Sequence, residues 1–290
     1  MSEVLRISNL FLRFRSYTGV TDVLHGISLN IQSGERVALV GESGSGKSVT
    51  ARIVLGQLQE LRSSQITGRL FFEGQDLNTL ARKKWYALRG TKISMIFQDP
   101  SSSLNPVFTI GTQFWEVLKR RAPRLTRAAA DNRARDLLNS VSIQDHVRVL
   151  NAFPFQLSGG MNQRVAIAMA LANGPSLLIA DEPGTALDVT VQAQTLPLMH
   201  DLVERTGTAV LFISHNLGVV REFADRIYVI YRGRIVEHGP TQTVFDKPGH
   251  AYTRALMAAV PRITGGGIPE IPDMDDAFLD PPVTHEVISA

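Results

Sequence analysis

Short, nearly continuous apolar runs recur along the chain, and each of them ends in polar residues or glycine. The runs are Arg36–Val40, Ile93–Phe97, Leu177–Ala180 and Ala209–Ile213. Runs of this length and kind are typical of strands that are buried on both faces, as in a parallel sheet. Ligands of such sheets lie beyond the carboxyl ends of the strands. The pattern therefore predicts an α/β fold with a mainly parallel sheet and a site at the strand ends.

Between about residues 99 and 172 the strand pattern gives way to helical spacing. Thr126 is the expected N-cap of one helix, and Ser158 that of a later, alanine-rich helix, which stops at Asn173-Gly174-Pro175. The apolar face of the first of these helices consists of Ala130, Ala134, Leu137, Leu138 and Val141. We interpret this part of the chain as a helical subdomain inserted into the α/β core. Further along, Arg226–Val236 predicts two strands around a turn at Arg232-Gly233.

The two ends of the chain carry less structural signal. No stretch approaches the roughly 20 apolar residues of a membrane-spanning helix, and the N-terminus has neither the basic nor the apolar region of a signal peptide. Residues 261–290 contain five prolines and six acidic residues. We expect a flexible tail there, and docking along a partner is the alternative. The predicted domain organisation is a core of residues 1–260 followed by this tail.

Composition excludes some kinds of site and leaves others open. The chain has 290 residues and no cysteine, so it holds no disulfide, zinc–thiolate site or thiolate-ligated iron–sulfur cluster. A formal net charge of +3 is too small to indicate nucleic-acid binding. Basic residues are concentrated between Lys119 and Arg135. A solvated helical face explains them, and a surface near anionic lipid is the alternative.

One motif predicts a specific chemistry. The stretch from Gly41 to Ser48, GESGSGKS, fits the P-loop pattern G-x-x-x-x-G-K-[ST] and follows the expected strand Arg36–Val40. Glycines let the backbone wrap around phosphate, so that amide groups and a helix N-terminus point at negative charge. Lys47 would reach the β- and γ-phosphates, and the Ser48 hydroxyl would bind Mg²⁺. The predicted nucleotide-binding residues are Gly41, Glu42, Ser43, Gly44, Ser45, Gly46, Lys47, Ser48 and Val49.

Further motifs, in order and at matching spacing, resemble those of the ABC ATPases. Leu157-Ser158-Gly159-Gly160-Met161 is similar to their signature sequence, and Leu177–Pro183 to their Walker B strand. The remaining matches are the Q-loop glutamine Gln98, the D-loop Ala186-Leu187-Asp188, the switch histidine His215 after Ser214, and an aromatic residue for the adenine ring, Phe14. The resemblance covers roughly residues 4–260. It implies an ABC ATPase core with an N-terminal antiparallel β region.

The resemblance also implies a role for each of these residues. Asp181 would hold Mg²⁺, and Glu182 would polarise the attacking water. Gln98 would reach the metal and the water, and His215 would sense the γ-phosphate. Ser158, Gly159, Gly160 and Asp188 would complete the ATP site of an opposite subunit.

Taken alone, most of these residues have simpler readings. An Asp-Glu pair after a strand is more often a turn or helix cap, and a single histidine is more often structural. Ser158–Gly160 could be an ordinary helix cap. Phe14 could be a core residue, with Phe11 or Tyr17 stacking on adenine instead.

Within the family, the chain looks most like the ATPases of dipeptide, oligopeptide and nickel importers. The segments that carry this likeness are Phe97–Pro100, Ser103–Pro106, Ala186–Thr190 and His250–Leu256. These importers usually pair two different ATPase chains, and Val49-Thr50-Ala51 after the P-loop makes this one similar to the first of the pair. Gly184 replaces the usual Thr or Ser, and Ala251 the usual proline. The cysteine cluster that many relatives carry in the tail is missing.

The resemblance implies an ATP- and Mg²⁺-dependent ATPase that powers an importer from the cytoplasmic face of the membrane. The implied partners are a second ATPase chain, two permease subunits that are contacted near Gln98–Phe108, and an extracytoplasmic substrate-binding protein, with no nucleic acid. Peptide is the expected cargo, and nickel, opines or sugars are alternatives. A soluble ABC ATPase acting on nucleic acid or ribosomes and an exporter ATPase are the rival functions.

Overall fold

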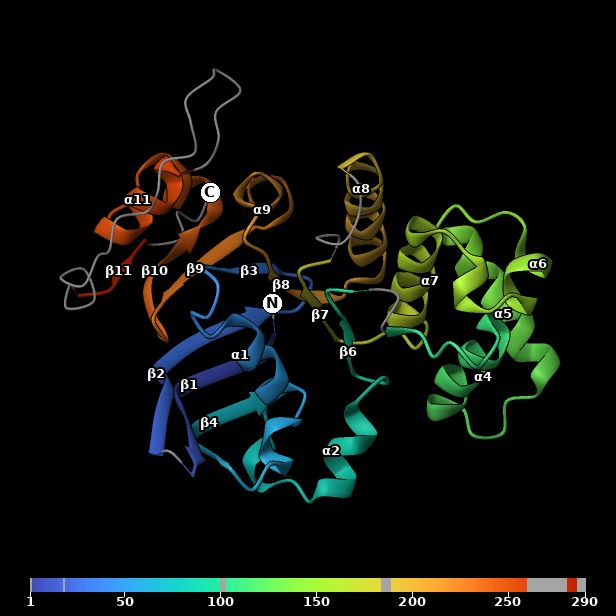
Figure 1. The fold of residues 1–290 in the computed structure, drawn as a ribbon, viewed down its shortest axis with the longest axis horizontal. Coiled ribbons are helices and arrows are strands. Elements are labelled where there is room, and N and C mark those ends of the chain that lie inside the picture. Colours follow the sequence, from blue (N-terminus) through green and yellow to red (C-terminus); the bar gives the residue numbers. More distant parts are fainter. Residues whose placement is uncertain (1, 18, 100–102, 184–188, 260–280, 286–290) are drawn as a thin grey trace. The chain divides into compact units, whose positions relative to one another are not determined.

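A computed structural model describes residues 2–17, 19–99, 103–183, 189–259 and 281–285 (Figure 1). The chain divides into two compact units. The first comprises Met1–Thr79 and Leu211–Ala290, and the second comprises Leu80–Val210. The second unit is thus an insertion in the sequence of the first, and it begins earlier and ends later than the predicted helical subdomain, residues 99–172. None of the helices in the described ranges is long and apolar enough to cross a bilayer.

The first unit contains an antiparallel sheet in the order β2-β1-β4-β5. Its strands are β1 (Glu3–Ser16), β2 (Gly19–Gln32), β4 (Ser64–Phe72) and β5 (Gln75–Asp76). Buried side chains alternate along β1 at Leu5 and Ile7, and again at Leu10 and Leu12. The register shifts between the two pairs, where Asn9 has a φ of 49°. The bulge keeps both pairs on the buried face, because a regular strand would turn the second pair outward.

The predicted phosphate loop lies on a second sheet. The first unit contributes to it β3 (Arg36–Val40), β9 (Arg226–Tyr231), β10 (Arg234–Pro240), β11 (Val283–Thr284) and most of β8 (Ala209–Ile213), in the order β11-β10-β9-β3-β8. Strand β3 pairs in parallel with β9, and β9 pairs antiparallel with β10. Residues Val37–Val40 have no exposed surface. The predicted runs at 36–40 and 209–213 and the predicted turn at Arg232-Gly233 are therefore confirmed.

Short helices connect these strands. They are α1 (Lys47–Val54), η1 (Leu58–Glu60), η2 (Leu77–Thr79), α9 (Leu217–Phe223), α10 (Thr241–Asp246) and α11 (Ala251–Ala258). Helix α1 follows β3 directly after the phosphate loop, and α9 follows β8. Helices α1 and α9 thus begin past the carboxyl ends of buried strands, which is where sheets of this kind bind ligands.

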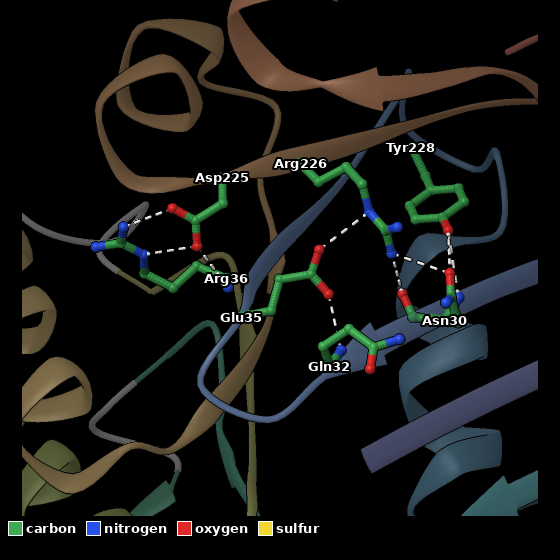
Figure 2. Close-up of polar contacts among 7 residues, drawn as sticks. All are labelled: Asn30, Gln32, Glu35, Arg36, Asp225, Arg226 and Tyr228. Atoms are coloured by element: carbon green, nitrogen blue, oxygen red, sulfur yellow. Dashed lines mark hydrogen bonds and ion pairs between the residues drawn. The ribbon is translucent and has the colours of Figure 1, made fainter. Parts of the chain in front are cut away.

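A polar network joins the turn between β2 and β3 to the start of β9 (Figure 2). The Arg226 guanidinium donates to the Asn30 carbonyl at 2.5 Å and to Asn30 Oδ1 at 3.0 Å. Its Nε lies 3.1 Å from Glu35 Oε1, and both side chains of this ion pair are 15% exposed. Burial raises the pKa of Glu35, although a hydrogen bond from Gln32 and the charge of Arg226 act against it. The charge of Arg226 therefore offsets part of the cost of burying an ionised Glu35 carboxylate.

Replacing Arg226 with alanine should destabilise the protein by about 2–4 kcal/mol, because it leaves Glu35 as a largely buried charge without its partner. Urea denaturation followed by circular dichroism would measure the free energy of unfolding. The control is Arg221→Ala, which removes an ion pair to Asp246 whose side chains are 58% and 46% exposed. That variant should unfold at nearly the wild-type midpoint. Equal stability of Arg226→Ala and the wild type would show that the network does not stabilise the packing of the two sheets of this unit.

The second unit is mostly helical. Its helices are α2 (Arg82–Leu88), α4 (Ile110–Arg121), α5 (Arg127–Ser140), α6 (His146–Asn151), η3 (Pro154–Gln156), α7 (Gly159–Leu171) and α8 (Val189–Thr206). Thr126 and Ser158 cap α5 and α7 as predicted, each accepting a hydrogen bond from a backbone N–H of the first turn. The expected face of α5 is buried at Ala130, Ala134 and Leu138. Two parallel strands, β6 (Ile93–Ile96) and β7 (Leu177–Asp181), complete the unit.

Several of the basic residues between Lys119 and Arg135 contact other parts of the second unit. Arg120 donates to the carbonyls of Tyr86 and Arg89, and Arg133 donates to that of Ala172 at the end of α7. Lys119 and Arg127 lie over the ring of Trp115. These contacts place cations against helix C-termini and an aromatic face, where they are favourable. They favour an ordinary helical face over a lipid-binding surface.

The end of the chain differs from the expected flexible tail at residues 281–285. Strand β11 pairs in parallel with β10, with Val283 opposite Glu237 and Thr284 opposite His238. Two glycines make room for it. A Cβ atom at Gly239 would lie 2.6 Å from that of His285, and one at Gly249 would lie 2.7 Å from a methyl group of Val283. Composition did not reveal this docking, because the segment is short and its partner is a distant strand.

Candidate active site

The loop from Gly41 to Ser48 connects β3 to α1, as the P-loop motif requires. Gly41, Gly44 and Gly46 all have positive φ, of 156°, 80° and 110°. A Cβ atom at Gly41 would lie 2.0 Å from the Ile230 carbonyl oxygen, and one at Gly46 would lie 2.6 Å from a Leu24 methyl group. Glycine is therefore the one residue that fits at these two positions. Gly46 is also the N-cap of α1, so the helix N-terminus opens directly onto the loop.

Lys47 is held inside this loop. Its ammonium donates to the Gly41 carbonyl at 2.9 Å and to the Glu42 carbonyl at 2.6 Å, and the residue is only 6% exposed. A buried cation at a helix N-terminus makes a strong anion site, because the helix dipole and free amide groups add to the charge. The loop geometry therefore fits the phosphate chain of a nucleotide.

The hydroxyl groups of the loop fit the same ligand. Ser45 Oγ is buried and has no hydrogen-bond partner within the part of the chain that the structure describes. A buried hydroxyl without a partner is costly, and a phosphate oxygen would satisfy it. Thr50 Oγ1 donates to the Gly46 carbonyl, which fixes the first turn of α1. Ser43 is exposed, while Ser48 and Val49 are half-buried in that turn.

In the second unit, Gln98 and Glu182 lie side by side. Strands β6 and β7 are parallel and pair Ile96 with Ala180, so the residues two positions further along each strand are brought together. Gln98 Nε2 donates to Glu182 Oε2 at 3.1 Å, and Gln98 is exposed. The sequence predicts a functional role for both residues, and their pairing follows from the register.

Asp181 and Glu182 differ in their surroundings although they are neighbours in the chain. Asp181 is the last residue of β7 and is 7% exposed. Glu182 is half-buried and has a φ of 50°, a left-handed conformation that is uncommon for residues other than glycine. Strain of this kind is concentrated at functional sites. The turn separates the two carboxylates, which suits two different roles.

The predicted signature residues form the exposed N-terminus of α7. Ser158 Oγ accepts from the Met161 N–H at 3.3 Å, which leaves the first amide groups of the helix at the surface. Ser158 and Gly159 are exposed and Gly160 is half-buried. Gln163, two residues after Met161, is fully buried, and its amide has no hydrogen-bond partner among the described residues. The exposed helix end fits an anion supplied from outside the unit.

The remaining predicted residues lie at several places. His215 is exposed just after β8, next to Ser214, whose hydroxyl accepts from the Asn216 N–H at 3.0 Å. Phe14 is half-buried on β1, opposite Thr21 and Ser64. Asp188, with the rest of the predicted D-loop, lies outside the described residues.

The two alternatives to Phe14 differ from each other. The ring of Phe11 covers Gly26, since a Cβ atom there would lie 2.9 Å from it. Tyr17 is fully exposed. Phe11 packs over Gly26 but is still 46% exposed, so Phe11, Phe14 and Tyr17 all keep accessible ring surface.

The predicted magnesium ligands are of a suitable kind. Ser48, Gln98 and Asp181 offer oxygen atoms, which Mg²⁺ prefers. Among the described residues, no three or more His, Cys, Asp or Glu side chains gather as a metal cage. Mg²⁺ in nucleotide enzymes is commonly held by one or two carboxylates and completes its shell with phosphate and water. Ser48 in the first unit, and Gln98 and Asp181 in the second, each offer a donor that such a shell can use.

Sequence reasoning missed one residue that contacts the phosphate loop. The Tyr252 hydroxyl accepts a hydrogen bond from the Glu42 N–H at 2.9 Å, and the Tyr252 side chain is fully buried. The two residues are 210 positions apart, so no local pattern connects them. The sequence singled out the segment His250–Leu256 through its resemblance alone, without a role for it.

Two family models match the chain. One, described as ABC transporter, matches residues 24–185. The other, described as the C-terminal region of oligopeptide/dipeptide transporters, matches residues 236–279. The first covers more than half of the chain and spans the phosphate loop, Gln98, the α7 N-terminus and Glu182. The second begins in β10 and includes α11.

Individual proteins agree with these matches. A probable peptide ABC transporter ATP-binding protein of Sinorhizobium fredii, y4tR, is 46% identical over 281 residues, covering 96% of this chain and 84% of that protein. The oligopeptide transport ATP-binding protein OppD of Bacillus subtilis is 44% identical, with 97% and 79% covered. A solved dimer of the ATP-binding cassette MJ0796, bound to ADP and Pi after hydrolysis, has a TM-score of 0.71 at 29% identity. It covers 82% of this chain and 98% of that one.

Proposed function

Because this chain belongs to the ABC transporter family, we propose that it is the ATP-hydrolysing subunit of a peptide importer. It is an ATPase by family, and its phosphate loop carries the assignment, with Lys47 buried among the loop's own carbonyls. The match of residues 236–279 to the C-terminal region of oligopeptide/dipeptide transporters supports peptide as the cargo. The names of the similar proteins from Sinorhizobium fredii and Bacillus subtilis support the same cargo.

The phosphate loop binds ATP through charge and amide groups. Lys47 leaves the Gly41 and Glu42 carbonyls for the β- and γ-phosphates, and the amide groups around Gly44 and Gly46 surround the phosphate chain. Ser48, Asp181 and Gln98 supply oxygen ligands for Mg²⁺, which neutralises phosphate charge when it is bound. Positioning and neutralisation of charge therefore provide most of the catalysis.

Hydrolysis depends on a water molecule aimed at the γ-phosphate. Glu182 orients and polarises this water, and its left-handed backbone holds the carboxylate after the end of β7. Gln98, hydrogen-bonded to Glu182, reports the state of the site to the helices that follow it in the second unit. His215 senses the γ-phosphate. Phe14 stacks on the adenine ring, a role that its partly open position on β1 permits.

The ATP site is completed by a second ATPase chain. The α7 N-terminus at Ser158, Gly159 and Gly160 contacts the nucleotide of the opposite subunit, together with Asp188. The exposure of Ser158 and Gly159 suits contact with another chain. The solved MJ0796 cassette, which is a dimer bound to ADP and Pi, supports this arrangement.

Membrane coupling is expected near the start of the second unit. Phe97, Val107 and Phe108 are 42%, 70% and 50% exposed, so three large apolar side chains of this part of the unit reach the surface. Exposed apolar side chains are suited to contact with a partner protein. We assign them to contacts with the cytoplasmic segments of two permease subunits. The ATPase thus acts from the cytoplasmic face, and an extracytoplasmic binding protein delivers the cargo.

A reconstituted transporter tests this function directly. The chain is combined with its partner ATPase, both permease subunits and the binding protein in liposomes, and ATP hydrolysis is measured with candidate ligands outside. Di- or oligopeptides should stimulate hydrolysis several-fold, while nickel, opines and sugars should not. Stimulation by one of those ligands alone would reassign the cargo. Co-purification with nucleic acid or ribosomes in place of permease subunits would overturn the importer function.

A further inference from the structure

One peptide unit of the phosphate loop is fixed from both sides. The carbonyl of Gly41 accepts the Lys47 ammonium at 2.9 Å, and the N–H of the same peptide unit, on Glu42, donates to the Tyr252 hydroxyl at 2.9 Å. A peptide plane is rigid, so the orientation of its N–H also sets that of its carbonyl. The Tyr252 contact therefore controls the direction of the oxygen that holds Lys47.

The Tyr252 ring is itself packed against the loop's support. It is fully buried and stacks on Tyr231, with ring centroids 4.1 Å apart. Tyr231 follows Ile230, whose carbonyl oxygen leaves no space for a Cβ atom at Gly41. Burial raises the pKa of Tyr252 above its ordinary value. The hydroxyl thus stays neutral, and it brings no negative charge near the predicted phosphate site.

Helix α11 holds Tyr252 in place through its N-terminus. The buried carboxylate of Glu237 accepts from the N–H groups of Gly249 at 2.7 Å and His250 at 2.9 Å. His250 Nδ1 then accepts from the Tyr252 N–H at 3.1 Å. Burial alone would raise the pKa of Glu237, but hydrogen bonds led by that from Gly249 bring it below its ordinary value. The carboxylate is therefore charged at neutral pH, as the N-terminus of a helix favours.

We propose that Tyr252 is a positioning residue of the ATP site, which orients the Gly41–Glu42 peptide unit so that Lys47 is presented to the phosphates. The proposal rests on the proposed function, because it assigns a task within that nucleotide site. It gives the C-terminal region of the chain a part in nucleotide binding, although this region follows the phosphate loop by about 200 residues. Tyr252 need not touch the nucleotide, since it acts through the loop backbone.

The test is Tyr252→Phe, which keeps the stacked ring and removes the oxygen that accepts from Glu42. The loop amide then lacks its partner, and the peptide unit is held only through its carbonyl. The dissociation constant for ATP, from titration of the full chain with a fluorescent ATP analogue, should rise roughly threefold to tenfold. In the assembled transporter the KM for ATP should rise by a similar factor, with kcat changed less than twofold.

Tyr228→Phe is the matched control. Tyr228 is also a buried tyrosine whose hydroxyl accepts a backbone N–H, that of Asn30 at 3.3 Å, and it donates to Asn30 Oδ1 at 2.9 Å, so its hydrogen bonds go to β2 and not to the phosphate loop. Both variants should lose thermal stability, and only Tyr252→Phe should weaken ATP binding. An unchanged dissociation constant in Tyr252→Phe, or an equal rise in both variants, would overturn the proposal. Failure of the wild-type chain to bind ATP would instead refute the proposed function.

Glu237→Gln provides a second test of the same connection. The amide keeps the shape of the side chain but loses the charge that caps α11 and can accept fewer N–H groups. ATP binding should weaken in the same direction as in Tyr252→Phe, by a smaller factor. Combining Glu237→Gln with Tyr252→Phe should then weaken binding no further than Tyr252→Phe alone, because both act through one hydrogen bond. Fully additive effects would show that Glu237 acts elsewhere.

Discussion

Glu182→Gln should reduce ATP hydrolysis roughly 10²- to 10⁴-fold, while ATP binding is retained. Glutamine fills the same space and can still bond to Gln98, which lies 3.1 Å from the native carboxylate. It cannot polarise a water molecule as a charged carboxylate does. Bound ATP then persists, and the closed pair of ATPase chains should accumulate. Phosphate release measures the hydrolysis, and size-exclusion chromatography with ATP and Mg²⁺ measures the pairing.

The control for this variant is Glu116→Gln. Glu116 is an exposed residue of α4 in the same unit and loses the same charge. Its hydrolysis rate should stay within twofold of the wild type. Substantial turnover by Glu182→Gln would remove Glu182 from the water-activating role and point to another base. Loss of ATP binding in the same variant would instead mean that the carboxylate mainly shapes the site.

Lys47→Ala should weaken ATP binding roughly 10- to 100-fold, which is the value of a charge-assisted hydrogen bond to phosphate. The variant also removes the hydrogen bonds from the Lys47 ammonium to the Gly41 and Glu42 carbonyls, which stabilise the loop conformation. Titration with a fluorescent ATP analogue measures the dissociation constant. Hydrolysis by the assembled transporter should fall to background.

Arg52→Ala is the matched control for this loss of positive charge. Arg52 lies in the last turn of the same helix, α1, and is exposed. Its removal should leave ATP binding within twofold of the wild type. If Lys47→Ala bound ATP normally, the phosphate-loop assignment would fail, and with it the nucleotide site as a whole.

The core strands and helix caps were predictable from the sequence because their determinants are local. A run such as Arg36–Val40 has to be buried on both faces, and it forms β3 with the expected bounds. Ser158 and Thr126 cap their helices through hydrogen bonds that span only three residues. The bulge at Asn9 was not predicted, since it depends on how β1 pairs with two other strands.

In the candidate site, too, local motifs were predictable from the sequence and contacts between distant residues were not. The phosphate loop is one continuous motif, so its residue types identify it. The pairing of Gln98 with Glu182 needs the register of β6 and β7, which a sequence pattern does not contain. The role of Tyr252 is still harder to predict from the sequence, because its contact with Glu42 joins positions 210 residues apart. The docking of residues 281–285 was missed because it depends on space left by Gly239 and Gly249.

Strand β11 has a consequence for the solubility of the chain. In the first unit it is the outermost strand of its sheet, and it covers part of β10 through a backbone hydrogen bond from His285 to the His238 carbonyl. An uncovered β10 would present unpaired backbone groups to any other extended chain, which is a common route to aggregation. A two-residue strand offers a far poorer template. Strand β11 thus protects this sheet edge against unwanted self-association.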